Sequence, residues 1–152
     1  MPFRPISGGC ACGRIRYDLV SDPITLYACH CTDCQTESGA SFTLSMLVTR
    51  DSIALTSGEP DLREYTLADG RVRRPYRCSA CNVTLWCVPR RFPDLLNLQP
   101  GTLDDTSWLH PAGHIWTRSR QPWIMLPQTA LSYDERPDDI LPLVRAWKDR
   151  NR

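Results

Sequence analysis

The six residues from Cys29 to Cys34 carry three thiols, at Cys29, Cys31 and Cys34, and the imidazole of His30. Cysteines of a disulfide framework are usually spread out to join distant loops, whereas three thiols at spacings of two and three residues can meet at one point. A soft, tetrahedral cation such as zinc is the natural occupant of that point. Three protein ligands leave a fourth position open, as in catalytic zinc sites. We therefore predict a catalytic zinc here. The alternatives are a second structural zinc, closed by His30 or Cys87, and a redox relay.

Four further cysteines form two pairs, Cys10 with Cys12 and Cys78 with Cys81. Two pairs supply four ligands, which is the closed coordination of a structural zinc. Sulfurs on one tetrahedral zinc lie about 3.8 Å apart, so the backbone around Cys10 and Cys12 must bend, and glycines flank both residues. We predict a structural zinc on these four thiols. Redox-active or free thiols are the alternative.

One cysteine and three histidines are not assigned as ligands of either predicted zinc. Cys87 stands between Trp86 and Val88, which predicts a buried thiol of the hydrophobic core. The side chain of His30 points away from those of its two neighbours in any extended backbone, which favours packing beside the site over coordination. The two remaining histidines, His110 and His114, lie among prolines, where a hydrogen-bonded loop histidine is the common outcome, although either could reach a site.

Three thiolates give a bound zinc a negative first shell, so it is a weaker Lewis acid than zinc on three histidines. Such an ion is suited to hold another thiol as a thiolate at neutral pH. A thiolate is a good nucleophile towards a small electrophile such as an aldehyde. The ligand set therefore favours thiol chemistry over hydrolysis.

Length and composition predict one domain over residues 1–152. Charged residues make up 23% and apolar residues 41% of the chain, and the formal net charge is +1, which favours neither nucleic acid nor a membrane surface as a partner. The N-terminus has no apolar run of signal-peptide length, and no stretch approaches the roughly 20 apolar residues of a membrane span. We expect a cytoplasmic protein, in which reduced thiols point to metal before disulfides.

Thirteen prolines argue against a helical bundle and favour short strands joined by turns. Residues 35–40 are predicted to be a loop, and the chain from Pro100-Gly101 to Pro137 is predicted to be irregular. A C-terminal helix over about 138–149 would be capped by Asp138 or Asp139 and would bury an apolar stripe. Alternation and turn signals predict strands over 14–20, 42–48, 53–56, 62–67, 72–76, 83–88 and 95–98.

Seven motifs of the chain form one pattern: GGCACGRIRY at 8–17, CHCTDC at 29–34, SG at 38–39, SGE at 57–59, CSAC at 78–81, GTLD at 101–104 and HIW at 114–116. Together these motifs resemble the family of glutathione-dependent formaldehyde-activating enzymes, which also includes centromere protein V. The resemblance covers about residues 5–125, and the spacing of its three cysteine clusters is highly specific. Asn82 departs from the usual glycine after the second pair, but asparagine also tolerates positive φ.

The resemblance implies a mainly β fold, a β-tent of small antiparallel sheets around zinc, and two zinc ions per chain. It implies a structural zinc on Cys10, Cys12, Cys78 and Cys81 and a catalytic zinc on Cys29, Cys31 and Cys34. It also implies a carbon–sulfur lyase that joins glutathione to formaldehyde. The helical extension lies outside the shared motifs.

The function expected is the joining of a glutathione-like thiol to a small aldehyde. One or two arginines could orient such an anionic thiol, and a solvated basic face is the alternative for these arginines. The rival function is a non-catalytic zinc module that binds a partner protein or senses metal or redox state. The arginines lie near the third cysteine cluster in sequence and are Arg71, Arg73, Arg74, Arg90 and Arg91.

Overall fold

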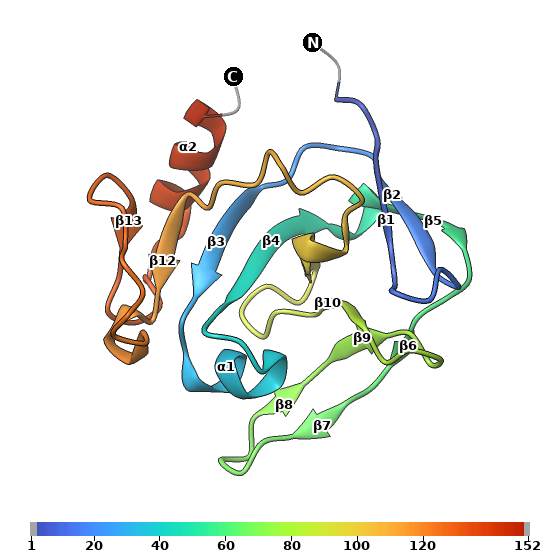
Figure 1. Cartoon of the computed structure of the whole chain (residues 1–152), viewed down its shortest axis with the longest axis horizontal. Helices are drawn as coiled ribbons and strands as arrows, with labels where there is room; N and C mark the ends of the chain where they lie inside the picture. The colour runs from blue at the N-terminus through green and yellow to red at the C-terminus, as the bar shows by residue number, and fades with distance from the viewer. Residues whose placement is uncertain (1–2, 151–152) are drawn as a thin grey trace. The chain divides into compact units, whose positions relative to one another are not determined.

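The computed structural model describes residues 3–150, and the chain divides into two compact units (Figure 1). The first unit contains residues up to 23 together with 46–109, and the second contains 24–45 and 110 onwards. Each unit is built from segments that are distant in sequence. The organisation as a single domain stays a prediction.

The first unit contains a three-stranded antiparallel sheet in the order β1-β2-β5. Strand β1 spans Ile6–Gly9, β2 spans Arg16–Leu19 and β5 spans Ile53–Ser57. The alternation that predicts a strand over 14–20 is correct, because Tyr17 and Leu19 are buried in β2. The pairing places Gly8 opposite Tyr17, and a Cβ on Gly8 would lie only 2.6 Å from the tyrosine oxygen. Glycine is therefore required at this close approach.

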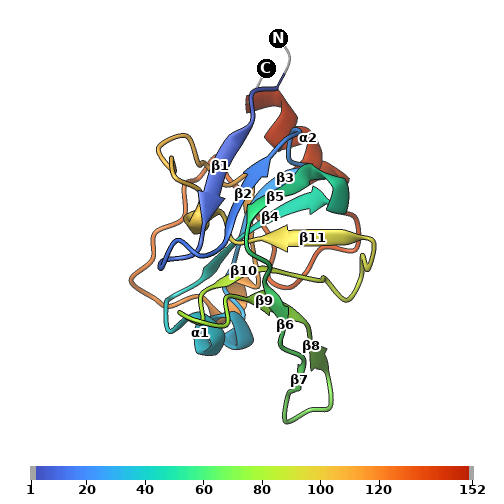
Figure 2. The ribbon, with the colours of Figure 1, turned by 90° about the vertical axis from the view of Figure 1, so that its right-hand side faces the viewer.

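The first unit also contains strands that pair antiparallel in the order β4-β11-β10-β9-β6. A separate hairpin of β7 and β8 extends away from these strands (Figure 2). The predicted strand over 95–98 is correct to the residue. The strands span Thr43–Thr49 (β4, paired with β11 from Met46 on), Asp61–Leu62 (β6), Tyr65–Thr66 (β7), Val72–Arg73 (β8), Pro75–Arg77 (β9), Thr84–Cys87 (β10) and Leu95–Leu98 (β11).

The core of the first unit is centred on Tyr17 and Trp86, whose rings meet edge to face with centroids 5.7 Å apart. The Tyr17 hydroxyl shares a 2.7 Å hydrogen bond with the hydroxyl of Thr102, so the polar end of this buried side chain is satisfied. Thr102 ends the short 3-10 helix η2 (Pro100–Thr102), and a second such helix, η1, spans Arg50–Ser52.

The second unit contains three strands in the order β13-β12-β3. Strand β3 spans Thr25–Cys29, β12 spans Gly113–Ile115 and β13 spans Leu131–Ser132. Strand β12 pairs parallel with both neighbours, which differs from the expected antiparallel pairing. The segment from Pro100-Gly101 to Pro137 was expected to be irregular, but it contributes β12, β13 and the 3-10 helix η3 (Thr117–Ser119).

Two α-helices belong to the second unit. Helix α1 (Thr32–Ser38) replaces the first part of the loop expected at 35–40. Helix α2 (Leu141–Arg150) is the predicted C-terminal helix, and the Asp139 carboxylate accepts a 2.8 Å hydrogen bond from the Leu141 N–H. Figure 1 shows α2 against β3 and β12, with Leu143 and Trp147 buried. The fold is therefore mainly β, with small sheets and a short C-terminal helix, as predicted.

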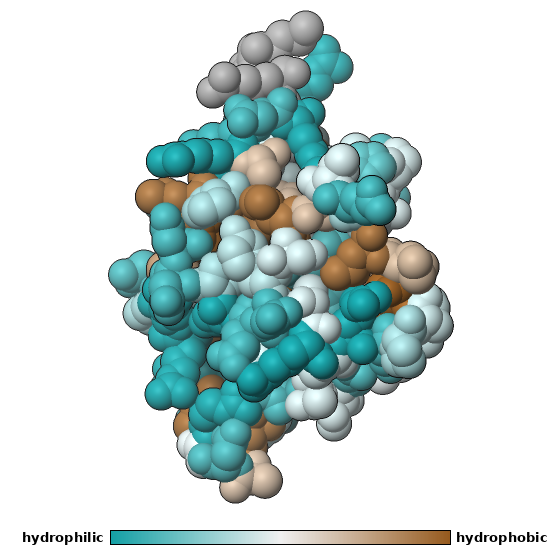
Figure 3. Space-filling view, turned by 90° about the vertical axis from the view of Figure 1, so that its left-hand side faces the viewer, coloured by the Kyte–Doolittle hydropathy of each residue, from teal (hydrophilic) through white to brown (hydrophobic). Residues whose placement is uncertain are grey.

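Hydrophilic residues predominate on the face shown in Figure 3, where hydrophobic side chains form small separate patches. Within residues 3–150, no helix has both the length and the apolar character needed to cross a membrane.

Candidate metal centres

The thiols of Cys10, Cys12, Cys78 and Cys81 meet in the first unit, with all four sulfurs within 4.8 Å of one another. The Cys10 and Cys12 sulfurs are 3.5 Å apart, and those of Cys12 and Cys78 are 3.7 Å apart. These separations exceed a disulfide bond length of about 2.05 Å. They match the roughly 3.8 Å expected between sulfurs on one tetrahedral zinc. The donor set therefore fits a closed four-thiolate metal site.

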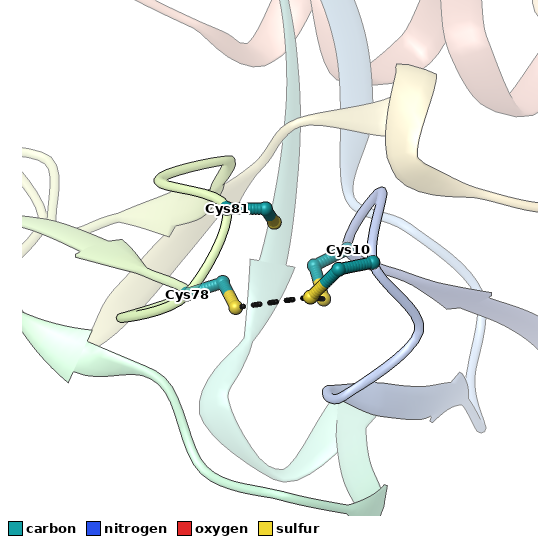
Figure 4. Close-up of side chains that lie close together, drawn as sticks. Cys10, Cys78 and Cys81 are labelled. Carbon is teal, nitrogen blue, oxygen red and sulfur yellow. Dashed lines mark hydrogen bonds between the residues drawn. The ribbon is translucent and has the colours of Figure 1, made fainter.

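Two turns of similar form present these four thiols. In the first, the Cys10 N–H donates to the Ile15 carbonyl at 3.1 Å, and Gly13 sits at φ +76°. In the second, the Cys78 N–H donates to the Val83 carbonyl at 3.0 Å, and Asn82 sits at φ 61°. Asparagine at a left-handed position thus takes the role that glycine takes in the first turn. Figure 4 shows Cys10, Cys78 and Cys81 with their sulfurs converging from the two turns.

Backbone N–H groups of the turns stabilise the thiolate form of Cys10 and Cys81. The Ile15 N–H donates to the Cys10 sulfur at 3.3 Å. The Val83 N–H, acting against desolvation, lowers the pKa of Cys81 to about 6. Ligand thiols must be deprotonated to bind a metal, so turns that favour the thiolate also favour binding.

The thiols of Cys29, Cys31 and Cys34 meet in the second unit, again within 4.8 Å of one another. Cys29 ends β3, Cys31 is the N-cap of α1, and Cys34 lies in the first turns of that helix. The Cys31 sulfur accepts a 3.3 Å hydrogen bond from the Cys34 N–H, which is the role that a serine or aspartate usually plays at a helix start. The local fold therefore brings the three sulfurs together through one strand end and one helix turn.

The group formed by these three thiols contains no fourth histidine, cysteine, aspartate or glutamate among residues 3–150. The imidazole of His30 is directed to His114 instead, and Cys87 is half-buried on β10 in the first unit. All eight cysteines are free of disulfides. The donor set therefore fits a metal ion with three protein ligands.

Crowding of the three thiols raises the pKa of Cys29, first through its hydrogen bonds with Cys31 and Cys34 and then through burial. Neighbouring thiolates repel one another in a buried site, so the fully deprotonated set needs a cation. A divalent ion would provide that positive charge.

The backbone N–H and carbonyl of His30, which lies between Cys29 and Cys31 in sequence, are both hydrogen-bonded. Its N–H donates to the Ile115 carbonyl at 3.0 Å. Its carbonyl accepts hydrogen bonds from Gln35 Nε2 and from Ser119 Oγ, both at 2.9 Å. The same Gln35 nitrogen donates to the Ser119 carbonyl at 2.9 Å, and the Gln35 oxygen accepts from Gln121 at 3.2 Å. Gln35 therefore ties α1, the thiol-bearing loop and the segment after β12 into one network.

Two buried histidines pack beside this network. Nε2 of His30 lies 3.0 Å from Nδ1 of His114, and the His30 ring is 5.1 Å from that of Phe42. Burial, reinforced by His114 and Arg120, lowers the pKa of His30 to about 4, and burial with Arg120 also lowers that of His114. Both imidazoles are therefore neutral at pH 7.

The sequence did not indicate Gln35 or Ser119 as site residues, and it left open whether His110 or His114 could reach a site. His114 was expected in a loop, but it lies on β12, whose pairing with β3 places His114 beside Ala28. The exposed His110 takes no part in this pair. Only the pairing of these distant segments shows which histidine is close to the thiols.

The model of one family, described as glutathione-dependent formaldehyde-activating enzyme, matches residues 5–119 of the chain. The chain belongs to this family. The matched region contains all seven clustered cysteines, together with Gln35, His114 and Ser119. Helix α2 lies outside it.

One curated relative and one solved structure extend the comparison. A Halomonas elongata protein, described as a "Putative glutathione-dependent formaldehyde-activating enzyme", is 24% identical over 124 residues, which cover 78% of this chain and 79% of the relative. A crystal structure of a Rhodobacter sphaeroides protein has a similar fold, with a TM-score of 0.53 and 14% identity. That likeness covers 68% of this chain and 92% of the other.

Proposed function

We propose that this member of the glutathione-dependent formaldehyde-activating enzyme family is a zinc-dependent carbon–sulfur lyase or synthase. Its substrates would be a glutathione-like thiol and a small aldehyde such as formaldehyde. The observation that supports this most directly is the difference in ligand number between the two cysteine groups, four in one and three in the other. The family match supports the choice of substrates. The proposal includes a cytoplasmic location, where thiols stay reduced.

The two groups of thiols have different roles in this proposal. Cys10, Cys12, Cys78 and Cys81 would hold a structural zinc, because four ligands leave no position for a substrate. Cys29, Cys31 and Cys34 would hold the catalytic zinc. When bound there, zinc supplies an open position at which an incoming thiol loses its proton at neutral pH.

The reaction forms one carbon–sulfur bond. The sulfur of the substrate thiolate attacks the aldehyde carbonyl carbon, and the electron pair of the C=O π bond moves to oxygen. That oxygen then takes up a proton, equivalent to the one the thiol lost, so that a hydroxyalkyl thioether forms without any oxidant or reductant. Lyase activity is the reverse of these steps.

The surrounding residues contribute by holding the ligand loop in place. Gln35 and Ser119 fix the carbonyl of His30, so Cys29 and Cys31 keep their spacing before any metal or substrate arrives. Buried Cys29 and Cys34 leave half-buried Cys31 as the most accessible thiol of the three. We expect the substrate to approach from the side of Cys31.

The test measures adduct formation directly. The zinc-loaded protein is mixed with glutathione and formaldehyde, and exchange between free glutathione and its adduct is followed by NMR. We expect exchange faster than the uncatalysed rate for the native protein and the uncatalysed rate for Cys31→Ser. Cys87→Ser, which alters a cysteine outside both groups, should retain the acceleration.

Two results would contradict the proposal. Native protein with two bound zinc ions and no acceleration would remove formaldehyde activation and favour a non-catalytic zinc module. Equal acceleration by native protein and Cys31→Ser would show that the three-thiol group is not the reaction centre.

A further inference from the structure

The side chain of Arg120 is half-buried and forms no ion pair within residues 3–150. Its Nη1 donates to the Ile124 carbonyl, and in the same range of residues Nε is buried with no hydrogen-bond partner. Arginine is always charged and its guanidinium offers five donors. Most of these donors therefore have no protein partner among the described residues.

Arg120 directly follows a residue that contacts the loop of the three-thiol group. This preceding residue, Ser119, donates its hydroxyl to the carbonyl of His30, which separates Cys29 from Cys31 in sequence. Arg120 therefore belongs to the same unit as the three thiols and is joined to their loop through Ser119.

A second arginine, Arg77, also has a buried Nε that finds no hydrogen-bond partner within residues 3–150. Arg77 precedes Cys78 directly, and four thiolates on a divalent ion would carry a net charge of −2. Three thiolates on a divalent ion carry only −1. A bound ligand with its own negative charge would make the net charge of the three-thiol centre beside Arg120 more negative.

We propose that Arg120 binds a carboxylate of the thiol substrate and so makes the three-thiol centre specific for anionic thiols. The inference rests on the proposed function and adds the substrate class and the residue that selects it. The planar guanidinium matches the geometry of a carboxylate, and the charge-assisted hydrogen bonds are among the stronger ones in proteins. Because Nε is covered, the carboxylate would bind at the terminal nitrogens.

Arg118, two residues earlier, provides a matched control. It is exposed, pairs with the Glu135 carboxylate and lies with its guanidinium carbon 5.0 Å from the centroid of the Trp116 ring. Its charge is already compensated, so loss of Arg118 should not alter substrate binding. The two variants Arg120→Gln and Arg118→Gln remove the same charge from the same segment.

The experiment uses S-methylglutathione, which has the carboxylates of glutathione but no free thiol. Calorimetry measures its binding to the zinc-loaded native protein and to both variants, with the dimethyl ester of the same compound as the uncharged ligand. We expect Arg120→Gln to weaken binding of the acid by about tenfold or more, and Arg118→Gln to leave it unchanged. The ester should bind all three proteins equally. Arg120→Lys keeps the positive charge but lacks the planar guanidinium. Its affinity for the acid should therefore lie between those of native protein and Arg120→Gln.

Several results would overturn the assignment. The first is that native protein fails to bind the acid. The second is that Arg120→Gln binds the acid as well as native protein does. The third is that Arg120→Gln loses affinity for the acid and for the ester to the same extent. Zinc content is measured for each protein. Loss of zinc in Arg120→Gln, with no discrimination between acid and ester, would show that Arg120 balances the metal centre instead.

A separate rate measurement distinguishes this inference from the proposed function. Formaldehyde exchange is followed with glutathione and with 2-mercaptoethanol, which has no carboxylate. Native protein that binds S-methylglutathione through Arg120 but accelerates neither reaction would contradict the proposed function alone. Acceleration of both reactions to the same extent in native protein and in Arg120→Gln would contradict the role of Arg120 alone.

Discussion

His30 and His114, which are distant in sequence, share one buried hydrogen bond, with 3.0 Å between Nε2 of the first and Nδ1 of the second. Only one of the two nitrogens can carry the shared proton, so each imidazole fixes the tautomer of the other. Nδ1 of His30 has no hydrogen-bond partner in the part of the chain that the structure describes. We therefore assign the proton to Nε2 of His30, since an unpaired N–H in the interior would cost more than an unpaired lone pair.

We expect His114→Ala to lower the free energy of unfolding by about 1–3 kcal/mol, because it leaves a buried nitrogen of His30 without a partner. The exposed His110 is the control, and His110→Ala should change stability by less than about 0.5 kcal/mol. Urea unfolding in zinc-saturated buffer measures both. Equal losses in the two variants would contradict the importance of the buried pair.

Gly113 on β12 has no room for a side chain. A Cβ there would lie 2.6 Å from Cδ2 of Leu143 in α2 and 2.7 Å from the Leu131 carbonyl oxygen in β13. Because the carbonyl belongs to a paired strand, it cannot move aside cheaply, and Gly113→Ala should destabilise the protein by about 1–3 kcal/mol. At Gly101 a Cβ would meet nothing within 4 Å, so Gly101→Ala should be nearly neutral. A thermal melt of each variant tests this, and similar melting temperatures would contradict the packing of α2.

Removing one ligand from each cysteine group should have different effects. Cys12→Ser breaks the four-thiol group and should lose one zinc together with cooperative unfolding, because structural zinc supplies folding energy. Cys31→Ser should lose the other zinc but keep a cooperative transition. Plasma emission and circular dichroism measure metal content and unfolding. Full zinc content in either variant would contradict the ligand assignment for that group.

The hydroxyl of Tyr17 should ionise only at strongly alkaline pH. Desolvation, acting against the hydrogen bond with Thr102, raises its pKa to about 12, whereas the ordinary value is about 10. A raised pKa in the folded state means that the unfolded state loses the proton first. The stability that Tyr17 contributes is therefore complete below about pH 10 and is lost as the pH rises towards 12.

The comparison is between Tyr17→Phe and Tyr133→Phe, each of which removes one of the five tyrosines. Unfolding in urea is measured at several alkaline pH values, and phenolate absorbance is recorded in parallel. We expect Tyr17→Phe to show a shallower loss of stability above pH 10 than native protein and Tyr133→Phe. Identical slopes for both variants would show that Tyr17 titrates normally.

Sequence alone predicted the elements that have a clear local pattern. Strands β4 and β11 follow from alternating or continuous apolar residues between turns, and α2 follows from its stripe and from Asp139. Helix α1 was missed because a thiol, rather than a serine or aspartate, accepts the capping hydrogen bond. Strands β12 and β13 were missed because both are short and lie among prolines, and their hydrogen bonds come from segments far away in sequence.

The cysteine groups could be predicted because their ligands lie close together in sequence or form recognisable pairs. The residues around them could not. Gln35 looks like any polar residue after the third thiol, and its role depends on two carbonyls, one of them at Ser119. Arg120 differs from its neighbour Arg118 only in what surrounds it, since one has a carboxylate partner and the other does not.

The four-thiol group joins residues that are 66 positions apart, from Cys12 to Cys78. A metal ion there would act as a reversible cross-link that closes a long loop, much as a disulfide does in secreted proteins. By the same loop-entropy relation, closing a loop of this length stabilises the folded chain by about 4 kcal/mol. Unlike a disulfide, such a link withstands reducing conditions and yields to a chelator, so the integrity of the first unit would depend on metal supply rather than on redox state.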